Sequence, residues 1–160
     1  MNNERTVPEH PLPVDVSLLL VRVIVGVIFA AHGAQKLFGV WGGPGLSAMM
    51  GPPGPPPNPG MGPVLGLLVT IGEFFGGVGL IVGFLTRFSA ASLIVIMIGA
   101  IAMVHGKKGF LLQNGGFEYN LALIGLLLPI FLCGAGRFSL GRYLPLPKVA
   151  GTRRPMILLE

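Results

Sequence analysis

One carboxylate, that of Glu73, is the only charged side chain in residues 37–86. It stands within the apolar segment 61–86, which is long enough to cross a bilayer as a helix. A charged side chain at the centre of a bilayer costs at least about 2–3 kcal/mol unless it is paired, protonated or hydrated. The sequence therefore predicts a membrane protein in which Glu73 has a partner and marks the position of the function.

The amino-acid composition also indicates an integral membrane protein. Of the 160 residues, 52% are hydrophobic and only 11% are charged, whereas a soluble domain carries about 25% charged residues. The single cysteine, Cys133, excludes an internal disulfide and a cysteine-based zinc or iron–sulfur site. We expect no metal site and no intrinsic cofactor, and we interpret the net charge of +5 as a topology signal rather than a sign of nucleic-acid binding.

Four apolar segments reach or approach the length of about 17–25 residues that a membrane-spanning helix needs. They are residues 16–38, 63–85, 88–104 and 117–133. The predicted fold is an all-α integral membrane protein, a bundle of four transmembrane helices that forms one domain over residues 16–133. Residues 39–62 are rich in glycine and proline and carry no charge, so we expect them to form an irregular extracytoplasmic loop.

The positions of lysine and arginine predict the orientation of the bundle, because cytoplasmic loops carry an excess of these residues. Four spans would place seven of them on one side, namely Arg5, Arg87, Arg137, Arg142, Lys148, Arg153 and Arg154. The other side would carry three, namely Lys36, Lys107 and Lys108. We therefore expect both termini in the cytoplasm, with a leader over residues 1–15 and a basic tail over residues 134–160 that attracts anionic lipid.

Arg22, Glu73 and His32 are the candidates for a buried polar site. Arg22 is the preferred partner of Glu73, because a guanidinium meets a carboxylate bidentately and stays charged; His32 is the alternative. In a functional interpretation, Glu73 and His32 offer proton and hydrogen-bond contacts to the head of a quinone. In a structural interpretation, the Arg22–Glu73 pair only fixes the register of two helices.

Further polar side chains gather at the expected extracytoplasmic ends of the helices, and they are Gln35, Lys36, His105, Glu118 and Asn120. This outer cluster and His32 are expected at similar depths in the membrane, so they can lie together at the mouth of one pocket. Two histidines and a carboxylate are suited to poising a proton, binding a metal or holding a quinone head. Simpler interpretations exist, since Lys36 can extend to the membrane surface and Glu118 can complement the dipole of its helix.

Three segments carry a family resemblance, and they read LLLVRVIVGVIFAAHGAQKLFG, GEFFGGVGLIVGFLTRFSA and GGFEYNLALIGLLLPIFLCGAGRFSLGRYL. Together they resemble the DoxX family of small four-helix bacterial membrane proteins, over residues 14–144. The resemblance implies that the family's recurring polar positions are Arg22, His32, Gln35, Lys36, Glu73, Glu118 and Arg137. The chain departs from the family pattern in its proline-rich loop, in residues 134–136, where a Gly-Pro-Gly turn is common, and at Gly141, where an acid is frequent.

The DoxX resemblance implies a position at the bacterial inner membrane beside redox enzymes, since the family name comes from a subunit associated with a quinone oxidoreductase. We expect a multi-pass accessory subunit of a redox or respiratory complex, without independent catalysis. Its expected partners are lipid, other subunits and a quinone, and not nucleic acid. The alternatives are a structural subunit at the edge of a larger assembly, and a carrier of a small solute or lipid, although no inverted repeat is visible.

Overall fold

The computed structural model describes residues 10–54 and 60–141, and within these ranges the chain is helical and forms no β-strand. The α-helices are α1 (Leu12–Phe38), α2 (Gly45–Met49), α3 (Pro63–Val82), α4 (Thr86–Ala100) and α5 (Glu118–Cys133). A π-helical turn over Ile101–His105 extends α4, and shorter 3-10 turns cover Val40–Gly42, Gly106–Lys108 and Leu112–Asn114. The all-α fold class is thereby confirmed.

Three helical segments of the described chain are long and apolar enough to cross a membrane. They are α1, α3 and the continuous segment Thr86–Lys108, whereas α5 is apolar but has only 16 residues. The count of four crossings and the cytoplasmic position of both termini stay predictions. Most of the predicted leader and tail, including Arg5, Arg142, Lys148, Arg153 and Arg154, lies outside the described residues.

Helix α1 begins at Leu12, earlier than the predicted start of the first span at residue 16. Proline in the first turn suits a helix start, and an acidic residue there complements the helix dipole. Because α1 begins at Leu12, Asp15 belongs to this helix and not to a leader, and its side chain is buried.

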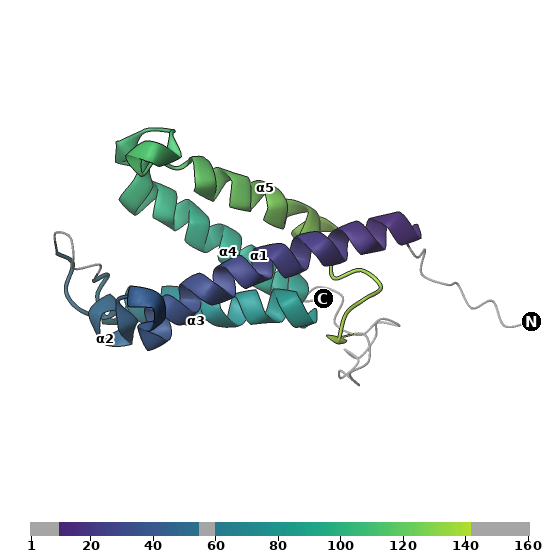
Figure 1. The fold of residues 1–160 in the computed structure, drawn as a ribbon, viewed down its shortest axis with the longest axis horizontal. Helices are drawn as coiled ribbons and strands as arrows, with labels where there is room; N and C mark the ends of the chain where they lie inside the picture. Colours follow the sequence, from purple (N-terminus) through teal and green to yellow (C-terminus); the bar gives the residue numbers. More distant parts are fainter. Residues whose placement is uncertain (1–9, 55–59, 142–160) are drawn as a thin grey trace, which may run out of the picture.

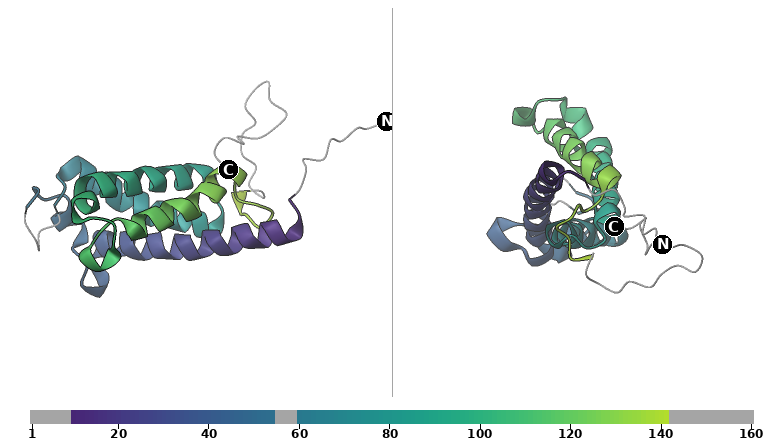
Figure 2. Two further views of the ribbon diagram at one scale, coloured as in Figure 1. Left: turned by 90° about the horizontal axis from the view of Figure 1, so that it is seen from above. Right: turned by 90° about the vertical axis from the view of Figure 1, so that its right-hand side faces the viewer.

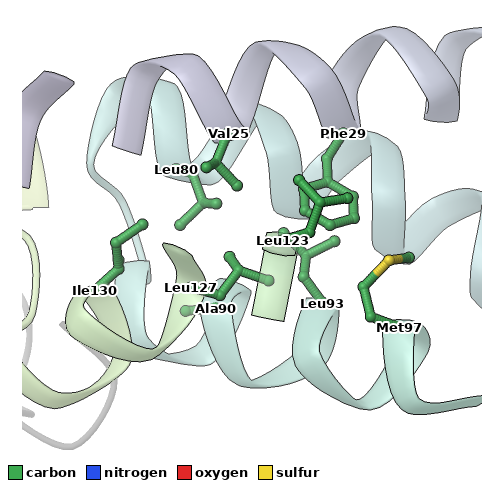
Figure 3. Packing of buried hydrophobic residues seen from close by; sticks show 9 residues of the cluster. All are labelled: Val25, Phe29, Leu80, Ala90, Leu93, Met97, Leu123, Leu127 and Ile130. Carbon is green, nitrogen blue, oxygen red and sulfur yellow. The ribbon is translucent and has the colours of Figure 1, made fainter. Parts of the chain in front are cut away.

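The long helices pack in the cyclic order α1, α3, α4, α5 (Figures 1 and 2). One end of the bundle holds the start of α1 and the segment after α5, and we call it the Arg22 end. The other holds α2 and the connection between α4 and α5, and we call it the Lys36 end (Figure 1). All four long helices contribute to one apolar core, which comprises Val25, Phe29, Leu80, Ala90, Leu93, Met97, Leu123, Leu127 and Ile130 (Figure 3).

Glycine allows α1 and α3 to approach each other closely. A Cβ atom at Gly33 would lie 2.3 Å from the backbone nitrogen of Phe74, and one at Gly77 would lie 2.4 Å from that of Ala30. Close backbone approach through small residues is the usual basis of helix packing in lipid, where no hydrophobic effect drives helices together. These contacts fix the register of the two antiparallel helices, and the register sets the depth at which their polar side chains meet.

Candidate functional site

An ion pair between Lys36 of α1 and Glu73 of α3 is the centre of the candidate site. The Lys36 ammonium donates hydrogen bonds to both carboxylate oxygens of Glu73. The Glu73 side chain is only 4% exposed and that of Lys36 is 24% exposed. The pair therefore gives the one charge of the 37–86 segment the partner that its position in an apolar helix requires.

The predicted Arg22–Glu73 pair is wrong, and the structure does not pair Glu73 with His32 either. Arg22 lies beside Gly83 at the opposite end of the bundle, since a Cβ atom there would be 2.6 Å from Arg22 Nη1. That position is about 15 Å from Glu73 along α3, at 1.5 Å of rise per residue. A guanidinium cannot reach across this distance, whereas Lys36 lies within reach. The Lys36 ammonium consequently contacts Glu73 inside the bundle.

Arg22 instead holds the segment that follows α5. Its guanidinium is buried and donates hydrogen bonds to the carbonyl oxygens of Ala135, at 2.7 Å, and Phe138. The carboxylate of Asp15 accepts a hydrogen bond from the backbone N–H of Arg137 and lies 3.2 Å from its Nε. Backbone hydrogen bonds from Leu140 to Val82 and from Gly141 to Gly83 complete this attachment. We call the attachment of residues 134–141 to α1 and α3 the terminal clamp.

A cavity of about 240 Å³ adjoins the Lys36–Glu73 pair. Its polar lining comes from each of the long helices and their extensions, and comprises His32, Lys36, Glu73, His105, Tyr119 and Asn120. Its apolar lining includes Phe29, Met97 and Leu123, which belong to the core. The structure thus brings His32, Lys36, His105 and Asn120 together around Glu73.

Gln35 and Glu118, the other members of the predicted outer cluster, do not line this cavity. The Glu118 carboxylate accepts a hydrogen bond from the backbone N–H of Leu112, 2.9 Å away, and so stabilises the connection between α4 and α5. The backbone of Gln35 packs against Gly43, and its carbonyl accepts the hydrogen bond that ends α1. Both residues have structural contacts in place of the predicted role at a pocket.

Tyr119 lines the cavity as well, although it was not among the residues of the predicted polar site or outer cluster. A signal was present in the sequence, because Leu123 follows it by one helical turn and belongs to the core. Residues four apart lie on the same face of a helix. Tyr119 therefore lies at the edge of the inward face of α5, beside the buried Asn120, and stays partly exposed.

Hydrogen bonds fix the orientation of two side chains in the lining. His105 Nδ1 lies 2.7 Å from the carbonyl oxygen of Gly115, which can only accept, so Nδ1 carries a proton. In the neutral ring, Nε2 is then an acceptor. The π-helical turn that ends α4 places His105 here, and such turns are frequent at functional sites. The buried amide of Asn120 donates to the sulfur of Met97, at 3.3 Å.

The site offers hydrogen-bond donors and acceptors beside the apolar core of the bundle. Lys36 and Asn120 supply donors, Glu73 and His105 Nε2 supply acceptors, and Tyr119 can do either. No group of three His, Cys, Asp or Glu side chains in residues 10–54 and 60–141 is arranged to hold a metal ion. The lining thus suits a compact polar ring with an apolar edge.

The sequence matches the family model of DoxX over residues 17–106. A Bacillus subtilis (strain 168) protein named "Putative oxidoreductase CatD" is 30% identical over 116 residues, which cover 72% of this chain and 79% of that protein. The Escherichia coli (strain K12) protein "Inner membrane protein YqjF" is 29% identical over 130 residues, covering 81% of this chain and 93% of the relative. An "Uncharacterized membrane protein Rv3486" of Mycobacterium tuberculosis is 29% identical over 142 residues, which cover 80% of this chain and 81% of that protein. No solved structure gives a significant match.

Proposed function

This chain belongs to the DoxX family of membrane proteins, and from that membership we propose that it is a small accessory subunit of a quinone-linked redox complex in the bacterial inner membrane. The name of the Bacillus relative, "Putative oxidoreductase CatD", supports the redox part of the proposal. The name of the Escherichia coli relative, "Inner membrane protein YqjF", supports the location in the inner membrane. The partners in this proposal are lipid, a quinone and the subunits that carry the redox cofactors.

The proposal includes a multi-pass topology with four crossings and both termini in the cytoplasm. Helix α5 supplies the fourth crossing, although its 16 residues span only about 24 Å of a hydrocarbon core about 30 Å thick. Supporting this assignment, α5 packs along α4 and contributes Leu123, Leu127 and Ile130 to the common core.

The observation that carries the quinone proposal is the polar cavity beside the Lys36–Glu73 pair. Its volume of about 240 Å³ is below the range of about 300–1,000 Å³ typical of drug-sized ligands, so it suits one substituted ring. We assign Lys36 to donate a hydrogen bond to one ring oxygen. His105 Nε2 accepts a hydrogen bond from a hydroxyl of the reduced ring, and Glu73 keeps the Lys36 ammonium in place.

Isolation of the native complex tests the subunit role. The chain is captured from gently solubilised native membranes, and mass spectrometry identifies the proteins that accompany it. The proposal predicts stoichiometric recovery with subunits that contain redox cofactors. Recovery of the chain alone, as a monomer or a homo-oligomer, contradicts the accessory role.

Substitution of Glu73 tests whether the cavity takes part in electron flow. In membranes that contain Glu73→Gln at wild-type level, quinone-dependent electron flow through the complex is expected to fall, because Lys36 loses its anionic partner. The matched control is Glu118→Gln, which changes a carboxylate outside the cavity. An unchanged rate in Glu73→Gln, with the assembly intact, rules out the quinone role.

A structural subunit is the second candidate, and the connection between α2 and α3 favours it. The backbone N–H groups of Met61 and Gly62 donate to the carbonyls of Met49 and Gly51, which closes the base of this loop. The loop carries no charge, so docking it against another subunit would bury no unpaired charge. Shortening residues 52–60 should then release the chain from its assembly while the bundle stays folded, whereas an intact assembly after shortening contradicts this candidate.

A further inference from the structure

The lining of the cavity divides into a buried part and an exposed part. Phe29, Met97 and Leu123 are buried and form its apolar interior. His32 of α1, together with Leu112 and Tyr119 of the α4–α5 connection and α5, is exposed. We call the space framed by these three exposed residues the entrance.

The entrance lies between α1 and α5. These helices pack less extensively against each other than α1 does against α3 or α4 against α5, and the two pairs diverge toward the Lys36 end (Figure 1). His32 precedes the last residue of α1, Phe38, by about 9 Å of helix rise. On the α1 side the entrance therefore lies below the end of the helix, while Leu112 and Tyr119 border it at the start of α5.

The connection between α4 and α5 covers the cavity at the Lys36 end. It is held by the hydrogen bond between His105 and Gly115 and by the bond from Leu112 to Glu118. A backbone bond from Phe117 to Gly109 tightens it further. Leu112 and the buried Gly116 of this connection contribute to the lining. The buried Gly116 thus lies over the cavity on the side of the helix ends, whereas the exposed His32 and Tyr119 border it between α1 and α5.

We infer that the ligand enters sideways from the lipid through this entrance and is a ring compound with a single long apolar chain. The cavity of about 240 Å³ holds a ring but not a long chain, so the chain remains in the entrance and in the surrounding lipid. His32 and Tyr119 each present an apolar body and a polar tip to this boundary. The inference rests on the proposed quinone function and adds the route and the chemical class of the ligand.

Spin labels at the entrance test the route directly. The only cysteine, Cys133, is first replaced by alanine. A single cysteine is then introduced by His32→Cys or Tyr119→Cys, and a spin label is attached to it. The protein is reconstituted in lipid nanodiscs, and collision with oxygen, which dissolves in lipid, is compared with collision with a water-soluble nickel chelate. Val27→Cys on the exposed face of α1 and Lys107→Cys at the Lys36 end provide the lipid and water references.

The inference predicts that both entrance labels, like the Val27→Cys label, collide more often with oxygen than with the nickel chelate. A long-chain quinone should lower oxygen collision at the entrance labels and leave the Val27→Cys label unchanged. Labels that collide with the nickel chelate, as the Lys107→Cys label does, would show an entrance from water and overturn the inference. Labels protected from both reagents would show that another chain covers the entrance, which also overturns it.

The ligand experiment separates this inference from the proposed function. If a quinone without a chain and a long-chain quinone both bind, yet neither protects the entrance labels, the route is wrong and the quinone function stands. If no quinone binds the wild-type protein at all, the proposed function fails together with the inference.

Discussion

The ammonium of Lys36 contacts both carboxylate oxygens of Glu73 across the interface of α1 and α3. This ion pair lies at the Lys36 end of a largely apolar bundle, and it forms part of the lining of the candidate cavity.

Removal of one partner of this pair should destabilise the bundle more than removal of both. Loss of one member of a fully buried pair costs about 3–5 kcal/mol, and because Lys36 is partly exposed we expect about 2 kcal/mol for Lys36→Met. The double variant Lys36→Met/Glu73→Leu should recover most of this loss, because no unpaired charge is left. Thermal unfolding in nanodiscs measures both effects, and equal losses in the single and double variants would contradict the pairing.

A methyl group at the α1–α3 contact should separate the two helices. Gly33→Ala and Gly77→Ala place a Cβ against backbone atoms, and overpacking of this kind costs about 1–3 kcal/mol. The matched controls are Gly99→Ala in α4 and Gly125→Ala in α5, where nothing lies within 4 Å of the added atom. The controls should be neutral or more stable by up to about 1 kcal/mol, since alanine is the better helix former. Equal effects at all four positions would show that close approach does not fix the register.

The terminal clamp should open when Arg22 is replaced. Arg22→Met leaves the carbonyl oxygens of Ala135 and Phe138 without this donor, and an unpaired buried acceptor costs about 1–3 kcal/mol. Hydrogen exchange of residues 134–141 should therefore accelerate, less so in Arg22→Lys, and not in the control Ser17→Ala on the exposed face of α1. Quinone binding should stay unchanged, because Arg22 lies at the opposite end of the bundle. Loss of binding with no change in exchange would instead place Arg22 in the ligand site.

His105 should distinguish the reduced ligand from the oxidised one. With Nδ1 donating to Gly115, the neutral ring accepts a hydrogen bond at Nε2, and only the quinol has a hydroxyl to donate. Loss of this bond in His105→Phe should weaken quinol binding about tenfold, equivalent to about 1.4 kcal/mol, and quinone binding less. The control is His10→Phe, an exposed position at the Arg22 end. Equal losses for both redox forms would contradict the assigned tautomer.

The helical fold could be predicted from the sequence because long apolar segments have few alternatives in a membrane. The partner of Glu73 could not be predicted from hydropathy, which gives the depth of a residue but not its rotation about the helix axis. The positions of the glycines in α1 indicate part of this rotation. Gly33 marks the face of α1 that contacts α3, and Lys36 follows it by three residues and so shares that face.

The cavity depends on features that a single apolar segment does not show. His105 is the last residue of a π-helical turn and contacts Gly115. A hydropathy profile does not distinguish a π-helical turn from an α-helical one. The terminal clamp likewise pairs Asp15 with Arg137, residues at opposite ends of the described chain. Such long-range contacts follow from the packing of the whole bundle and not from local sequence.

Photoaffinity labelling with an azido-quinone would show whether a quinone ring occupies the cavity beside Lys36 and Glu73. The purified chain is reconstituted in nanodiscs, irradiated with and without excess unlabelled quinone, and mapped by mass spectrometry. We predict saturable labelling within residues 29–36 and 105–123. Excess unlabelled quinone should remove it, and the variant Lys36→Met/Glu73→Leu should lack it. Labelling that does not saturate, or that persists unchanged in the double variant, would contradict this prediction.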